Sequence, residues 1–92
     1  MTARIEIPSA LLAFTDNQKI VEVPEGTLED VLNSLFSKHS QLRQHLYDDK
    51  GHVRSFVNVF VNDEDIRFAQ NLKTPVKGGD TVHIIPSIAG GA

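Results

Sequence analysis

Four histidines are the side chains in this sequence whose type could support metal binding. They are His39, His45, His52 and His83. His39 and His45 are six residues apart, a spacing that does not place both on one helix face, and no cysteine is present to complete a zinc site. We therefore predict no metal site and expect the histidines to lie on the surface.

Two further stretches have the residue types of binding loops. Asn62–Asp65 is rich in carboxylates but lacks the spacing of a calcium loop, and Gly78-Gly79 lacks the surrounding residues of a phosphate-binding loop. Polar residues and glycine favour turns, and a positive φ would explain both glycines, so we predict a turn at each stretch. None of the serines lies in a nucleophile motif. The sequence therefore predicts a protein that is not an enzyme and binds no cofactor itself.

The segment after Pro86, with the sequence SIAGGA, is the remaining candidate for function. An apolar run ends at Pro86, so the segment starts from a rigid anchor, and Gly90 and Gly91 make its far part slender. Extended at roughly 3.3–3.6 Å per residue, residues 87–91 would span at most ~17 Å. Glycine lets surrounding walls approach the backbone closely. We therefore predict that residues 87–92 form a flexible tail that can enter a narrow channel in another protein.

Residues 1–86 are expected to form one domain that carries this tail. Alternating apolar residues predict strands at 3–7, 19–23, 56–62 and 81–85, with a short strand at 66–68. Residues 9–17 are expected to form a loop. The strand at 56–62 carries bulky apolar residues on both faces, so we expect each of its sides to be partly covered.

One helix is clearly indicated. Its apolar stripe has helical spacing and consists of Leu28, Val31, Leu32, Leu35 and Phe36. Thr27 is a suitable N-cap, and a shorter helical turn is expected at residues 41–46. Since one amphipathic helix covers only one face of a sheet, we predict a two-layer α+β domain whose other sheet face is available to a partner.

Composition limits the class of partner. The chain has 92 residues, enough for one small domain, and a net charge of −3. This mild acidity argues against nucleic acid, whose recognition requires a basic surface. No stretch approaches the ~18 apolar residues of a membrane span, and the N-terminus lacks the layout of a signal peptide. We therefore expect a cytoplasmic protein with neither a nucleic-acid nor a membrane partner.

Three segments together resemble the MoaD/ThiS family of ubiquitin-like sulfur carriers: VNVFVNDEDIRF, the GGD turn and the final VHIIPSIAGG. The resemblance covers nearly the whole chain, and it is greatest to the carriers that serve cysteine biosynthesis. It implies a β-grasp fold, with a mixed sheet of four to five strands and one main helix packed on one face. The domain would cover residues 1–86.

The resemblance also implies a chemical role for the main chain at Gly91. In this family an E1-like enzyme uses ATP to adenylate the terminal glycine carboxylate, and a sulfur donor converts the acyl-adenylate to a thiocarboxylate. The recognised tail residues would be Ile88, Ala89, Gly90 and Gly91. In the cysteine route the thiocarboxylate attacks an activated serine derivative on a PLP-dependent synthase, and a JAMM-type zinc metalloprotease releases the product.

Ala92 departs from the family pattern, which ends at the second glycine. One extra residue moves the carboxylate ~3.3–3.6 Å along an extended chain. Reacting atoms must lie within about 3–3.5 Å of each other, so this offset should block activation. We predict that Ala92 is a cap and that the bond between Gly91 and Ala92 is the processing site, with the JAMM-type enzyme as the candidate protease.

The free sheet face is where ubiquitin-like carriers meet their activating enzyme, so we predict a partner surface that includes Phe56, Asn58, Phe60 and Phe68. At least two of these aromatic side chains are nevertheless expected to belong to the core. Alternatives within the family are the small subunit of molybdopterin synthase and a thiamin-type carrier. A protein modifier joined to lysines through Gly91, or a scaffold with no tail function, is also compatible with the sequence.

Overall fold

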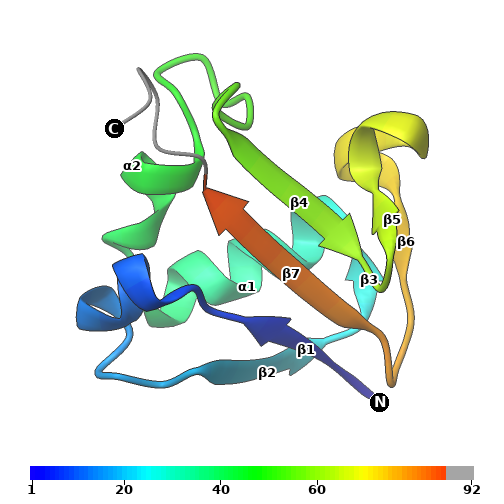
Figure 1. The fold of residues 1–92 in the computed structure, drawn as a ribbon. Helices are drawn as coiled ribbons and strands as arrows, with labels where there is room; N and C mark the ends of the chain where they lie inside the picture. Colours follow the sequence, from blue (N-terminus) through cyan, green and yellow to red (C-terminus); the bar gives the residue numbers. More distant parts are fainter. Residues whose placement is uncertain (87–92) are drawn as a thin grey trace.

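The computed structural model describes residues 1–86, which form a mixed sheet with one long helix against one face (Figure 1). The sheet has the strand order β2-β1-β7-β4-β5. Its strands are β1 (Thr2–Glu6), β2 (Ile20–Pro24), β4 (Val57–Val61), β5 (Glu64–Asp65) and β7 (Thr81–Pro86). A second, two-stranded sheet pairs β3 (Gly26–Thr27) with β6 (Pro75–Val76).

The helices lie between these strands in sequence. The long helix is α1 (Leu28–Lys38), and α2 (Leu42–Leu46) follows it. Three short 3-10 helices complete the structure: η1 (Ser9–Phe14), η2 (Ile66–Phe68) and η3 (Asn71–Lys73). The two-layer arrangement with one main helix is the one that the sequence predicts.

Helix α1 begins at a capping box. The Asp30 N–H donates to the Thr27 hydroxyl and the Thr27 N–H donates to the Asp30 carboxylate, both at 3.2 Å. These bonds satisfy two backbone donors that an uncapped helix start leaves unpaired. The apolar stripe of α1 is buried as expected, because it packs on the sheet.

The core lies between α1 and one face of the sheet. The strand residues directed at α1 are Ala3, Ile5, Val21, Val23, Val57, Val59, Val61, Val82 and Ile84, and all are buried. Within the sheet, β1 and β7 run parallel, with Ile5 opposite Val82, while the other neighbouring strands are antiparallel. Because two parallel neighbouring strands require a crossover connection, the chain between β1 and β7 contains one, and α1 forms part of it.

Three local predictions need correction. Residues 9–14 form a 3-10 helix rather than an open loop, and its Leu11 is buried in the core. Residues 66–68 form a 3-10 helix, because the Asp65 carboxylate accepts from the Arg67 N–H and caps this turn where the β4–β5 pairing ends. The longest predicted strand, 56–62, is shorter than expected and spans Val57–Val61.

Candidate functional site

The last described strand, β7, lies in the middle of the sheet. It pairs with β1 on one side and with β4 on the other, and Pro86 lies opposite Val57 of β4. A strand held on both sides is a rigid support for whatever follows Pro86. The tail residues predicted to carry function, Ile88, Ala89, Gly90, Gly91 and Ala92, lie outside the described residues.

The sheet face opposite α1 carries a mixed apolar and polar surface around β7 and β4. Phe60 lies opposite His83, and Asn58 lies opposite Ile85, with all four on this face because their neighbours along each strand are buried. Ile85 is 51% exposed, a large fraction for an isoleucine in a central strand. We call Asn58, Phe60, His83 and Ile85 the open-face patch.

A polar pair borders this patch on the β1 side. The Nδ1 atom of His83 lies 3.0 Å from Oε1 of Glu6, its register partner on the parallel strand. Both side chains remain accessible, so a partner that covers the open-face patch also meets one hydrogen-bonding pair. The surface is therefore suited to a partner with both apolar and polar groups.

The four residues predicted as a partner surface are only partly brought together. Asn58 and Phe60 are half-buried members of the open-face patch. Phe68 lies in η2 and is 84% exposed, and Phe56 precedes β4 and is 39% exposed. The expectation that at least two of these aromatic side chains are core residues is wrong, because the core side of β4 is occupied by its three valines.

The acidic stretch at residues 62–65 forms the predicted turn. Asn62 has a positive φ of 56°, and its side chain donates to Asp80 Oδ1 at 3.2 Å and accepts from the Thr81 N–H at 3.1 Å. Asp65 caps η2 and binds the Arg67 guanidinium at 2.9 Å. The side-chain hydrogen bonds from Arg67 lower the pKa of Asp65, and the backbone N–H of Arg67 adds to the effect. The Asp65 carboxylate is therefore engaged in local structure.

Gly78-Gly79 also forms a turn, but the two glycines are needed for different reasons. Gly79 has a φ of 89°, where a side chain causes strain. Gly78 does not share this conformation; a Cβ atom there would lie 2.5 Å from the Cβ of Met1. Close packing against the first residue, rather than a positive φ, explains Gly78.

The histidines do not converge. His52 is exposed, and His39, His45 and His83 are half-buried at separate places. Within residues 1–86 no group of three or more His, Cys, Asp or Glu side chains is placed to hold a metal ion.

Among residues 1–86, none of the helices is long and apolar enough to cross a bilayer.

Residues 5–91 match the sequence model of the ThiS family. The chain belongs to this family. Sulfur carrier protein CysO of Mycobacterium tuberculosis is 39% identical over 93 residues, which cover 99% of this chain and all of that protein. Small archaeal modifier protein 3 of Haloferax volcanii is 34% identical over 73% of this chain and 72% of its own length.

The fold is shared with solved structures of the family. The structure matches that of the Amycolatopsis orientalis BexX/CysO complex with a TM-score of 0.89 and 36% identity, over 97% of this chain and 99% of that one. This match confirms the β-grasp fold. The relatives named here are small carriers and modifiers, and the chain is a protein of this kind rather than an enzyme.

Sequence reasoning missed two members of the open-face patch. Ile85 and His83 alternate with buried Val82 and Ile84, so the period of two already placed them on the face away from the core. What the sequence lacked was the strand order. Only the pairing of β7 with β4 brings Ile85 and His83 next to Asn58 and Phe60.

Proposed function

We propose that this protein is a sulfur carrier whose Gly91 carboxylate is the functional group. The observation that carries the proposal is the similarity to CysO over the full length of both chains. Two further observations support it. The family match ends at residue 91, which leaves Ala92 outside, and the central strand β7 leads directly into the proposed tail.

The proposed chemistry has two steps. An E1-like enzyme joins the Gly91 carboxylate to the AMP moiety of ATP and releases pyrophosphate. A sulfur donor then attacks the acyl carbon, AMP leaves, and the carbon–oxygen bond to AMP is replaced by a carbon–sulfur bond. The absence of cysteine from the chain agrees with this role, because the sulfur is held on the main chain.

Removal of Ala92 must precede both steps, because the Gly91 carboxylate does not exist while the peptide bond to Ala92 is intact. We propose a JAMM-type zinc metalloprotease as the enzyme that cuts this bond. The destination of the sulfur would be cysteine or a related amino acid, with a PLP-dependent synthase as the acceptor, by analogy with the CysO relatives.

The activating enzyme would contact the open-face patch while it holds the tail. Ile85 lies one residue before Pro86, and Asn58 lies opposite Ile85 on the neighbouring strand, so both are close to the origin of the tail. A partner that covers Ile85 removes its exposed half from water, which favours binding by about 1 kcal/mol, because the side chain is already half-buried.

The test compares two chains, one ending at Gly91 and one ending at Ala92. Each is incubated with the E1-like enzyme from the same organism, ATP and a sulfide source, and its intact mass is measured. We expect only the chain ending at Gly91 to gain the mass difference between sulfur and oxygen. Equal conversion of both chains would disprove the role of Ala92 as a cap, and conversion of neither would count against the carrier function.

A protein modifier is the second candidate, and the similarity to small archaeal modifier protein 3 favours it. In that case the activated Gly91 carboxyl forms an amide bond with a lysine amine of a target protein. Immunoblots of the native host under denaturing conditions distinguish the two. A ladder of larger species that requires Gly91 indicates a modifier, whereas a single small species indicates a carrier.

A further inference from the structure

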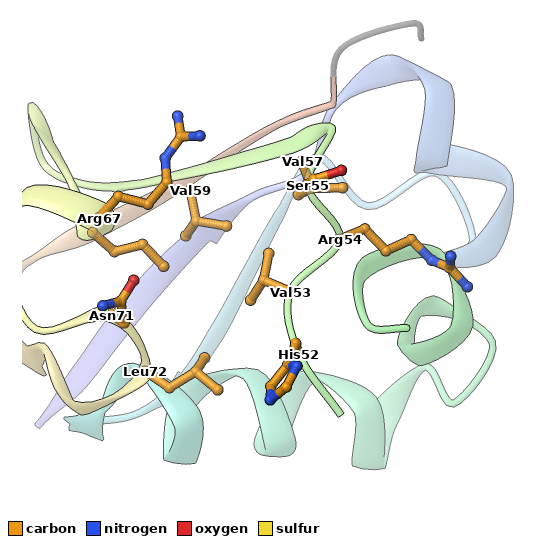
Figure 2. A pocket seen from close by; sticks show the side chains of 10 residues that line it. His52, Val53, Arg54, Ser55, Val57, Val59, Arg67, Asn71 and Leu72 are labelled. Carbon is orange, nitrogen blue, oxygen red and sulfur yellow. The ribbon is translucent and has the colours of Figure 1, made fainter. Parts of the chain in front are cut away.

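A cleft of about 320 Å³ lies on the core side of β4, away from the open-face patch. Its apolar walls come from three separate segments: the loop before β4, β4 itself and the η2–η3 region. The wall residues are Val53, Val57, Val59, Ile66 and Leu72. Figure 2 shows Val53, Val59 and Leu72 facing a common space. The volume is at the lower end of the range for ligand sites and is large enough for one ring system.

The mouth of the cleft is polar. His52, Ser55 and Asn71 line it, and their side chains make no hydrogen bond to any other residue of 1–86. No carboxylate is among the lining residues, although acidic residues outnumber basic ones in the chain. The guanidinium groups of Arg54 and Arg67 point away from the space, so only their stems border it (Figure 2). The cleft thus combines an apolar interior with a hydrogen-bonding mouth that contains no carboxylate.

The cleft lies beside the end of β7. Val57 forms part of its wall and is also the register partner of Pro86. An enzyme that holds the residues after Pro86 therefore reaches the surroundings of Val57 as well.

We propose that this cleft receives an aromatic side chain with a polar edge, tyrosine or tryptophan, from the enzyme that takes up the tail. Such a side chain has a large apolar body and a hydrogen-bonding tip, which matches an apolar interior and a polar mouth. Aromatic anchors of this kind dominate the energetics of many protein interfaces. The assignment to the tail-binding enzyme rests on the proposed function, whereas the chemistry of the cleft does not.

The first experiment tests the cleft on the isolated full chain. N-acetyltyrosinamide and N-acetyltryptophanamide are titrated into ¹⁵N-labelled protein, with N-acetylleucinamide as the non-aromatic control. We expect saturable shift changes centred on Val53, Val59 and Leu72, and about two- to tenfold weaker binding of the leucine compound. Equal binding of all three compounds, or changes centred on the open-face patch, would overturn the proposal.

Two variants and one matched control localise the effect. Ser55→Glu places a carboxylate at the mouth without altering a buried residue, and Ser37→Glu makes the same change on the exposed side of α1 as a matched control. We expect weaker binding of the aromatic compounds only for Ser55→Glu, because the longer side chain narrows the mouth of the cleft. Val53→Phe fills the cleft and should weaken binding by about tenfold, provided that its spectrum shows an intact fold.

The second experiment identifies the source of the aromatic group. With the chain ending at Gly91, Ser55→Glu should raise the KM of the activating enzyme for the carrier and leave kcat unchanged, while Ser37→Glu changes neither. Unchanged KM despite weakened compound binding would show that the partner does not use the cleft. Failure of every chain, including the unaltered one, to form the thiocarboxylate would contradict the carrier function and leave the compound-binding result intact.

Discussion

Asn62 and Asp80 join two turns that are far apart in the sequence: the Asn62 Nδ2 atom donates to Asp80 Oδ1 at 3.2 Å. The same carboxylate accepts from the Lys77 N–H at 2.8 Å through its other oxygen. One turn connects β4 to β5 and the other leads into β7. The pair therefore fixes the start of β7, the strand that leads to the proposed tail, against the neighbouring strand.

Replacing Asp80 by asparagine should lower the free energy of unfolding at neutral pH. The variant should also lose less stability than the unaltered protein when the pH is lowered. The Lys77 N–H, and then the Asn62 side chain, hold the pKa of Asp80 below its ordinary 3.8. Because the folded pKa is below the unfolded one, the carboxylate stabilises the protein above pH 3.8, and this contribution is lost as the pH falls through the folded pKa. Urea unfolding across this range measures the effect. Asp49→Asn, at an exposed loop position, is the control.

Replacing Tyr47 by phenylalanine should stabilise the protein. Tyr47 is buried, its hydroxyl has no hydrogen-bond partner within residues 1–86, and burial raises its pKa. Removing an unsatisfied hydroxyl relieves a desolvation cost of about 1–3 kcal/mol, while the ring contact with Phe36 is kept. Thermal and urea unfolding provide the measurement. Tyr47→Leu, which loses the ring contact, should destabilise; a loss of stability in Tyr47→Phe would show that the hydroxyl is satisfied in solution.

Thr27→Ala should lower the free energy of unfolding by about 1 kcal/mol, because it removes the oxygen that accepts the Asp30 N–H at the start of α1. Thr27→Ser keeps the acceptor and should retain most of the stability. Chemical denaturation of the three proteins tests this. Equal losses in both variants would indicate that the methyl group, and not the hydroxyl, is the stabilising part.

Ile85→Ser should impair recognition by the activating enzyme without unfolding the domain. Ile20→Ser is a matched control, since Ile20 is 50% exposed on the edge strand β2 and Ile85 is 51% exposed on the central strand β7. Loss of an apolar side chain whose exposed half becomes buried in the complex should raise the KM by roughly three- to tenfold. Steady-state adenylation with both variants measures it, and equal effects of the two would refute a contact centred on β7.

The sequence by itself determined most of the local structure. The spacing of Leu28, Val31 and Leu35 predicted α1, Thr27 marked its start, and alternation located β1, β2, β4 and β7 to within one or two residues. These features depend on near neighbours, namely the period of a helix or strand and the cap of a helix end. The family could be predicted as well, since its motifs lie in continuous segments.

The surfaces were decided by the tertiary structure. Alternation in β4 showed that Val57 and Phe60 lie on opposite faces, but both faces are apolar, so only the packing of α1 decides that the valines are core and Phe60 is not. Likewise, nothing local brings Leu72 of η3 to Val53 and Val59, or Ile85 to Asn58. Such contacts depend on which strands pair and in which register. That choice is made by the burial of the whole core rather than by any one segment.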